Sequence, residues 1–125
     1  MKIISPTNHG YLDYATVVLF LLAPSLFGLS GLPAMLAYGL AAVHLAVTLA
    51  TDFPFGVVKI IPFTLHGWIE RLVGPLLVLI PFILGFSDQE AARNFYDFIG
   101  IVIIAVGILT DYEGTATQRG TVSHT

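Results

Sequence analysis

The chain has 125 residues, a net charge of −3 and no cysteine, so disulfide bonds and thiolate chemistry are excluded. Hydrophobic residues make up 56% of it and charged residues only 10%, whereas about a quarter of the residues of a soluble domain are charged. The length fits one domain, and no basic run indicates a nucleic-acid partner. No charged residue lies between Asp13 and Asp52, which would leave large apolar patches in water. The composition therefore predicts an integral membrane protein whose main partner is the lipid bilayer.

The first predicted helix covers residues 9–29, with Thr7 or Asn8 as its N-cap. At about 1.5 Å per residue, a helix of this length is ~30 Å long, which is enough to cross the hydrocarbon core. A side-chain oxygen at the N-cap accepts a hydrogen bond from a free N–H group of the first turn. Pro24 lies inside the helix, and because proline has no N–H and crowds the preceding turn, a kink is predicted there.

The second predicted helix covers residues 33–51 and contains His44, an ionisable residue deep in an apolar span. His44 needs a hydrogen-bond partner, because an unpaired polar group in hydrocarbon costs several kcal/mol. Thr48, one turn further along the same helix, is one candidate partner, and Tyr14 or Tyr38 is an alternative from elsewhere. An intramembrane histidine indicates either a functional group or a hydrogen bond that holds helices together.

The third predicted helix covers residues 65–86 and follows a segment, residues 52–65, that is too short and broken to span a membrane. We expect this segment to be an interfacial loop whose aromatic side chains lie at the headgroup boundary. Those side chains belong to Phe53, Phe55 and Phe63. Thr64 is the predicted cap of the helix, and Pro81 predicts a second kink.

The fourth predicted helix covers residues 88–110. Ser87 and Glu90 have the spacing of a capping box, in which two side chains satisfy each other's free backbone N–H groups. The remaining residues, 112–125, are polar and have no apolar periodicity, so we expect a disordered tail.

Residues 2–30 and 59–87 align without a gap at an offset of 57 and are identical at 11 of 29 positions. The identical pairs include Lys2/Lys59, Thr7/Thr64, His9/His66, Gly10/Gly67, Pro24/Pro81 and Gly28/Gly85. Chance matching of apolar helices would not align these residue types, so the sequence predicts an internal duplication. Repeat 1 then covers residues 1–58 and repeat 2 covers residues 59–111. The second helices of the two repeats match only where a Thr-Asp pair ends each of them.

Two spans in each repeat give both repeats the same orientation in the membrane. The predicted fold is therefore an all-α membrane protein with four transmembrane helices, built as two tandem parallel repeats about a pseudo-two-fold axis along the membrane normal. Lys2, Lys59, Arg71 and Arg119 fall on the side of the two termini, and only Arg93 falls on the other. The positive-inside rule then predicts that both termini lie in the cytoplasm.

Histidines and acids gather at the predicted cytoplasmic end. The first and third predicted helices each have a histidine followed four residues later by an acid on the same face. The second and fourth predicted helices each end next to an aspartate. The six residues of this predicted ring are His9, Asp13, Asp52, His66, Glu70 and Asp111. Such a ring can bind a divalent metal ion or carry protons. The alternatives are a haem held between the two histidines and side chains that only line the membrane interface.

The end of the first helix in each repeat has an x-Pro-x element followed by Gly-x-Ser. These elements are Ala23-Pro24-Ser25 with Gly28-Leu29-Ser30, and Ile80-Pro81-Phe82 with Gly85-Phe86-Ser87. The pattern resembles the SPW-repeat family of small bacterial membrane proteins, which has a Ser-Pro-Trp motif in the first of two transmembrane helices per repeat. Only the proline of that motif is present here. The resemblance implies a four-span protein of the bacterial cytoplasmic membrane and no particular activity.

No nucleotide-binding loop, nucleophile triad or zinc-protease motif occurs in the sequence, so we do not expect an enzyme. The leading functional prediction is a structural or accessory protein that assembles with itself or with a larger membrane protein. Faces lined by small residues, such as Ala42 with Ala46 and Gly100 with Gly107, would allow close helix contact. The alternative is a small transporter, or a metal-, proton- or haem-binding protein, that uses the ring and His44.

Overall fold

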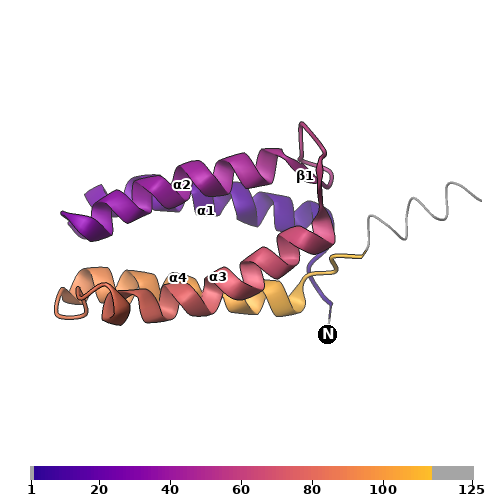
Figure 1. Ribbon diagram of the computed structural model, residues 1–125. Helices are drawn as coiled ribbons and strands as arrows, with labels where there is room; N and C mark the ends of the chain where they lie inside the picture. The colour runs from indigo at the N-terminus through magenta and orange to yellow at the C-terminus, as the bar shows by residue number, and fades with distance from the viewer. Residues whose placement is uncertain (1, 114–125) are drawn as a thin grey trace, which may run out of the picture.

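A computed structural model describes residues 2–113 of the chain (Figure 1). Its four helices are α1 (Pro6–Phe27), α2 (Leu32–Leu49), α3 (Phe63–Ile83) and α4 (Glu90–Leu109), and its two short strands are β1 (Thr51–Asp52) and β2 (Ile61–Pro62). All four helices are long and apolar enough to cross a membrane. The prediction of a helical protein with four potential membrane spans is confirmed, with helix ends that differ from the predicted ones by one to three residues.

The helices form two antiparallel hairpins that lie one over the other (Figure 1). Helix α1 packs along α2, and α3 packs along α4. Gly74 and Gly100 bring the second pair together, because a Cβ atom added to Gly100 would lie 2.7 Å from the Gly74 carbonyl oxygen. Large apolar side chains on the outside, such as Leu72 and Ile101, are exposed. A bilayer would cover this outer surface with hydrocarbon.

Both odd helices end in the same way. Gly28 and Gly85 have φ angles of 64° and 78°, a left-handed conformation that glycine adopts without strain. The residue after each glycine donates its N–H to the proline carbonyl. Leu29 donates to Pro24 at 3.0 Å, and Phe86 donates to Pro81 at 2.8 Å. These bonds satisfy carbonyl groups that a helix end leaves free. Both prolines lie inside their helices, and the kinks predicted there stay predictions.

The predicted N-caps are wrong in α1 and α3. The Ser5 hydroxyl caps α1 by accepting a hydrogen bond from the Asn8 N–H at 3.1 Å. The helix begins at Pro6, because proline has the φ angle that suits a first helical position, and Ser5 is therefore the N-cap. Helix α3 has no side-chain cap, and Thr64 lies inside it.

The capping box predicted for α4 does not form. Gln89 is the N-cap of this helix and its side chain makes no capping hydrogen bond. The Ser87 carbonyl accepts a hydrogen bond from Arg93 Nη1 at 3.2 Å, which ties the start of α4 to the preceding turn in another way.

Two short parallel pairings close the end of the bundle that holds the linking loop. Strand β1 pairs with β2, Thr51 with Ile61, and Ile4 forms a parallel bridge with Thr110. In Figure 1 this end also holds the N-terminal segment and the end of α4. The pairings bring the residues that follow α2 and α4 next to the first turns of α3 and α1.

Aromatic residues of the loop fold inward. Phe53 and Phe63 are 1% and 2% exposed and stack on each other, and Tyr112 packs against them. Phe53 and Phe63 therefore pack inside the protein, and their position at the headgroup boundary stays a prediction. Tyr112 belongs to this aromatic cap (Phe53, Phe63 and Tyr112) although the sequence placed it in a disordered tail. Residues 114–125 of that predicted tail lie outside the described residues.

Candidate metal centre

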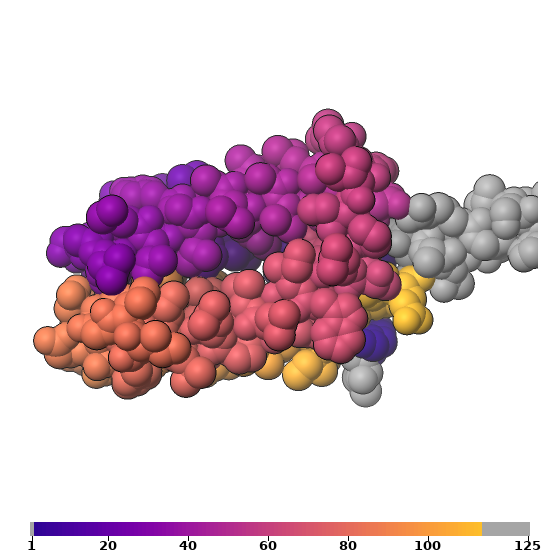
Figure 2. Space-filling model, viewed as in Figure 1, coloured from indigo at the N-terminus to yellow at the C-terminus, as the bar shows by residue number. Residues whose placement is uncertain are grey.

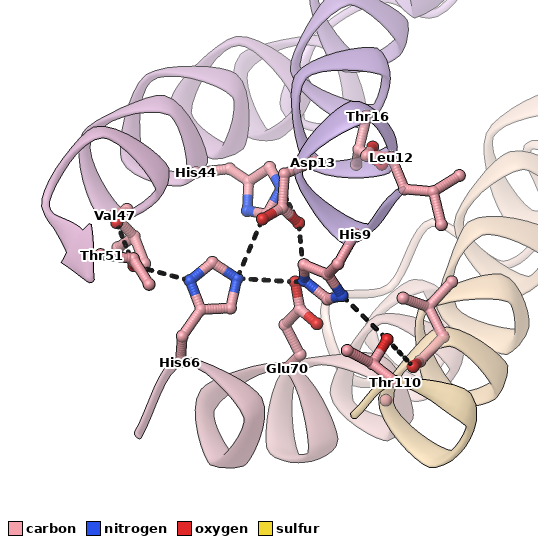
Figure 3. Close-up of polar contacts among 12 residues, drawn as sticks. His9, Leu12, Asp13, Thr16, His44, Val47, Thr51, His66, Glu70 and Thr110 are labelled. Carbon is pink, nitrogen blue, oxygen red and sulfur yellow. Dashed lines mark hydrogen bonds and ion pairs between the residues drawn. The ribbon is translucent and has the colours of Figure 1, made fainter. Parts of the chain in front are cut away.

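Two histidines and two carboxylates meet at the closed end of the bundle, between the hairpins (Figure 3). His9 and Asp13 lie one turn apart on α1, and His66 and Glu70 lie one turn apart on α3. One nitrogen or oxygen atom from each of the four lies within 4.8 Å of the others. The residues are buried, with exposed fractions between 0% and 7%. These four side chains therefore pack inside the protein, and the alternative of a purely structural role at the membrane interface stays a prediction.

The spacing of the donor atoms suits a small metal ion. Glu70 Oε1 lies 2.9 Å from His66 Nε2 and 3.1 Å from His9 Nε2. The two oxygens of Asp13 lie 3.1 Å from His9 Nε2 and 3.3 Å from His66 Nε2. Tetrahedral ligands at the usual zinc distances of about 2.0–2.1 Å are about 3.3 Å apart. Only small side-chain adjustments would therefore be needed to place an ion among them.

The opposite nitrogen of each histidine is bound to a threonine. His9 Nδ1 lies 2.9 Å from the Thr110 hydroxyl oxygen, and His66 Nδ1 lies 2.8 Å from that of Thr51. Each hydroxyl gives its only hydrogen to a carbonyl oxygen of its own helix, at 2.7 and 2.6 Å respectively. The hydroxyl oxygens can then only accept, so both Nδ1 atoms carry the proton and donate. The Nε2 atoms are the ones that face the carboxylates.

This arrangement requires protons or a metal ion between the rings and the acids. An unprotonated Nε2 has a lone pair that points at a carboxylate lone pair about 3 Å away, which is repulsive. Either a proton shared between each Nε2 and a carboxylate oxygen or a metal ion removes the repulsion. Two imidazolium rings with two carboxylates sum to zero charge, and so does one divalent ion with two neutral rings and two carboxylates. Electroneutrality matters here because an unbalanced charge in a low-dielectric interior is costly.

Asp13 is buried with its carboxylate between the two histidines. It is 3% exposed, and the contact of its Oδ2 atom within residues 2–113 is with His66 Nε2, at 3.3 Å. Buried carboxylate oxygens in proteins are normally hydrogen-bonded or bound to a metal. The Asp13 carboxylate points into the same space as the Nε2 atoms (Figure 3).

The aromatic cap supports the site from outside. Tyr112 donates a hydrogen bond from its hydroxyl to Glu70 Oε2 at 2.8 Å. Burial, and to a lesser extent the Glu70 charge, raises the pKa of Tyr112 well above its usual value, so the phenol stays a donor. The ring of His9 packs edge-on against those of Phe63 and Tyr112, at 5.2 and 5.3 Å between centroids. The cap thus holds the Glu70 carboxylate and the His9 ring in place.

The repeated His-Gly pair has a packing reason. A Cβ atom on Gly67 would lie 2.8 Å from the Tyr112 ring, and one on Gly10 would overlap the Phe55 ring. Glycine therefore lets aromatic side chains cover the helix turn that carries each histidine.

His44 contacts the site from α2. Its Nε2 atom lies 3.5 Å from Asp13 Oδ1, its ring centre lies 6.3 Å from that of His66, and its side chain is 19% exposed. Nε2 has no hydrogen-bond partner in residues 2–113.

The predicted partners of His44 are wrong. The Thr48 hydroxyl is fully buried and has no partner in the described part of the chain. Tyr14 donates to the Phe55 carbonyl at 2.9 Å, and Tyr38 is about half exposed. His44 therefore contacts Asp13 and does not form the predicted polar site with Thr48.

Asp52 and Asp111, which the sequence also placed in the ring, are not members of the group that could hold a metal. The residue before each of them, Thr51 or Thr110, points to a histidine instead. The chain is extended after each helix, and successive side chains of extended backbone point to opposite sides. The Thr-Asp pair that follows α2 and α4 was the sequence signal that could have identified these threonines. In each pair the threonine contacts the site, and the aspartate does not.

A haem between His9 and His66 does not fit. Glu70 Oε1 lies within 3.1 Å of the Nε2 atoms of both rings. A porphyrin placed between the rings would have to displace this carboxylate together with Asp13.

A comparison of the chain with models of protein families, with curated proteins and with solved structures found no match.

Proposed function

We propose that this protein is an integral membrane metal-binding protein in which His9, Asp13, His66 and Glu70 hold one divalent transition-metal ion. The observation that carries the proposal is the convergence of four buried donor atoms whose histidines already donate their other N–H to a threonine. Metal-binding histidines usually have such an outer partner, which fixes the ring and its tautomer.

Zinc is the ion that fits best. It accepts imidazole nitrogen and carboxylate oxygen, and it favours four ligands in a tetrahedron. The absence of cysteine argues against ions that need soft sulfur ligands, and two imidazoles argue against magnesium and calcium. Iron(II) and manganese(II) accept the same donors, so they are the competing ions to include in a binding assay.

We also propose that the two hairpins are tandem repeats about a pseudo-two-fold axis, with both termini in the cytoplasm. Equivalent contacts support the repeat. Ile4 pairs with Thr110 and Ile61 pairs with Thr51, and each threonine binds the histidine of the other hairpin. Under the 57-residue offset, Ile4 is equivalent to Ile61. The excess of lysine and arginine at this end supports the orientation.

Assembly with a second copy or a larger membrane protein is a second candidate role. Ala42 and Ala46 are exposed on α2, so this small-residue stripe is open to another helix. Gly100 and Gly107 are buried and face α3, so their face is used within the hairpin. A bound metal and an assembly role are compatible, because the stripe and the site do not share residues.

Metal analysis of the purified protein tests the leading proposal. After incubation with Zn²⁺ in detergent and removal of excess ion, we expect one zinc per chain. Asp13→Asn and Glu70→Gln keep the shape of each side chain and remove the charge, so each should weaken binding by more than about 100-fold, above the usual effect of outer partners. Asp88→Asn and Glu90→Gln, both at exposed positions, are the matched controls. Retention of stoichiometric zinc by the double variant Asp13→Asn/Glu70→Gln would overturn the proposal.

A further inference from the structure

A cavity lies directly beside the candidate metal centre, inside the bundle. Its volume is about 110 Å³, and all four helices contribute to its wall. A single water needs only roughly 10–15 Å³ on this scale. Most of the wall is aliphatic or aromatic, including Phe20, Leu40, Val73, Leu77 and Ile103. A space of this size and polarity suits an apolar chain better than a cluster of waters.

Three of the four proposed ligands, Asp13, His66 and Glu70, line the cavity. The other polar residues of the wall are Thr16 and His44. An ion held by the four ligands would therefore face the cavity. His44 Nε2, which has no hydrogen-bond partner within residues 2–113, lies in the same wall.

The cavity is accessible from the side of the bundle. Figure 2 shows a hollow between α2 and α3 on the face that would contact lipid. Val43 of α2 lines the cavity and is 61% exposed, so it lies where the cavity meets the outside. The buried aromatic cap of Phe53, Phe63 and Tyr112 covers the end of the bundle nearest the metal centre. Entry between α2 and α3 selects a molecule dissolved in the bilayer, not a water-soluble solute.

The charge of the metal centre restricts the polar head group of that molecule to an uncharged one. One divalent ion already balances Asp13 and Glu70, so a further anion would leave a net negative charge in a low-dielectric interior. A neutral hydroxyl or carbonyl oxygen adds a ligand without adding charge. A four-coordinate zinc-type ion accepts such a fifth donor. His44 Nε2 lies 3.5 Å from Asp13 Oδ1, where it is placed to hydrogen-bond to the same head group.

We propose that the cavity binds a neutral, long-chain amphiphile that enters from the bilayer and places a hydroxyl or carbonyl oxygen on the metal ion beside His44. The proposal rests on the metal-binding function above. It adds the ligand class: an apolar tail between the hairpins and one uncharged oxygen head at the closed end.

Visible absorption of bound Co²⁺ tests the two proposals separately. Co²⁺ replaces Zn²⁺ in such sites, and its tetrahedral bands lose intensity when a fifth ligand binds. The Co²⁺-loaded protein in phospholipid nanodiscs is titrated with 1-dodecanol, dodecane and dodecanoate. We expect a saturable loss of band intensity with 1-dodecanol only. Failure to load Co²⁺ would overturn the metal proposal, whereas normal loading without a response to 1-dodecanol would overturn the ligand proposal alone. An equal response to dodecanoate would overturn the requirement for a neutral head.

Two variants locate the response in the cavity. Val73→Phe fills part of the cavity, and Val18→Phe adds the same volume at a position exposed on α1. We expect Val73→Phe to load Co²⁺ but to lose the response to 1-dodecanol, and Val18→Phe to keep both. Loading in each variant shows that the protein is folded. A response in Val73→Phe equal to that of the parent would place the alcohol elsewhere and overturn the proposal.

Discussion

Thr110, at the end of α4, holds His9, at the start of α1, through a hydrogen bond of 2.9 Å between the Thr110 hydroxyl oxygen and His9 Nδ1. The two residues are 101 positions apart. Thr51 and His66 form the same contact at 2.8 Å. Each even helix thus orients the histidine of an odd helix in the other hairpin, and the two Nε2 atoms are left to face the acids. The candidate metal centre therefore depends on both hairpins and on their relative placement.

Replacing these threonines should weaken metal binding without removing a ligand. Thr51→Val and Thr110→Val each remove the acceptor for a histidine Nδ1–H, and loss of such an outer partner costs about 10–100-fold in affinity. Competition with a chromophoric zinc chelator measures the effect. Thr48→Val is the matched control, because the Thr48 hydroxyl is buried without a partner in the described residues, and we expect it to keep the parent affinity. Parent affinity in Thr51→Val and Thr110→Val would mean that the threonines do not orient the rings.

Zinc binding should release about two protons at neutral pH. Without metal, each Nε2 needs a proton to face a carboxylate, and a divalent ion replaces both protons with no change in net charge. Calorimetry in buffers that differ in ionisation enthalpy gives the number directly, from the slope of binding enthalpy against buffer enthalpy. His44→Leu removes a histidine that is not one of the four ligands and should leave the number unchanged. Binding without proton release would contradict the two protons assigned to the metal-free site between the Nε2 atoms and the acids.

Substitution of Gly67 should destabilise the fold. In Gly67→Ala the added methyl group meets the Tyr112 ring at 2.8 Å, and overpacking of this kind typically costs about 1–3 kcal/mol. Gly39→Ala is the control: a Cβ atom there meets nothing within 4 Å, and alanine favours a helix by roughly 1 kcal/mol over glycine. Thermal unfolding in one detergent should rank Gly39→Ala at or above the parent and Gly67→Ala below it. Equal midpoints for the two variants would contradict the close contact with the cap.

Removal of the Tyr112 hydroxyl should weaken metal binding and leave the packing intact. Tyr112→Phe keeps the ring against Phe63 and His9 but removes the hydrogen bond to Glu70 Oε2. As an outer partner of a ligand, the hydroxyl should contribute about 10-fold or more in affinity. Tyr38→Phe, at a half-exposed position, is the control. Zinc affinities measured for both variants check the prediction, which fails if they are equal.

Composition and the lengths of the apolar segments were enough to predict four membrane-spanning helices, because a bilayer core demands about 20 apolar residues per helix. The spacing of four residues between His9 and Asp13, and between His66 and Glu70, predicted that each pair shares a helix face, because the α-helix places such residues one turn apart. The 57-residue offset indicated that the two pairs are equivalent.

Tertiary structure decided which polar residues meet. Thr51 and Thr110 enter the site, and Asp52 and Asp111 do not, because the direction of each side chain depends on the backbone just after the helix. The same holds for Tyr112, whose burial depends on chain segments more than 40 residues away.

The sequence by itself therefore determined the apolar helices and the His/acid pair within each of α1 and α3, since both follow from local periodicity and from the chemistry of the bilayer. Only the packing of the two hairpins decided that the four candidate ligands converge, that His44 faces Asp13, and that a cavity lies beside them. Contacts of this kind join residues far apart in the chain, and their geometry depends on how whole helices fit together, which no local pattern of residues encodes.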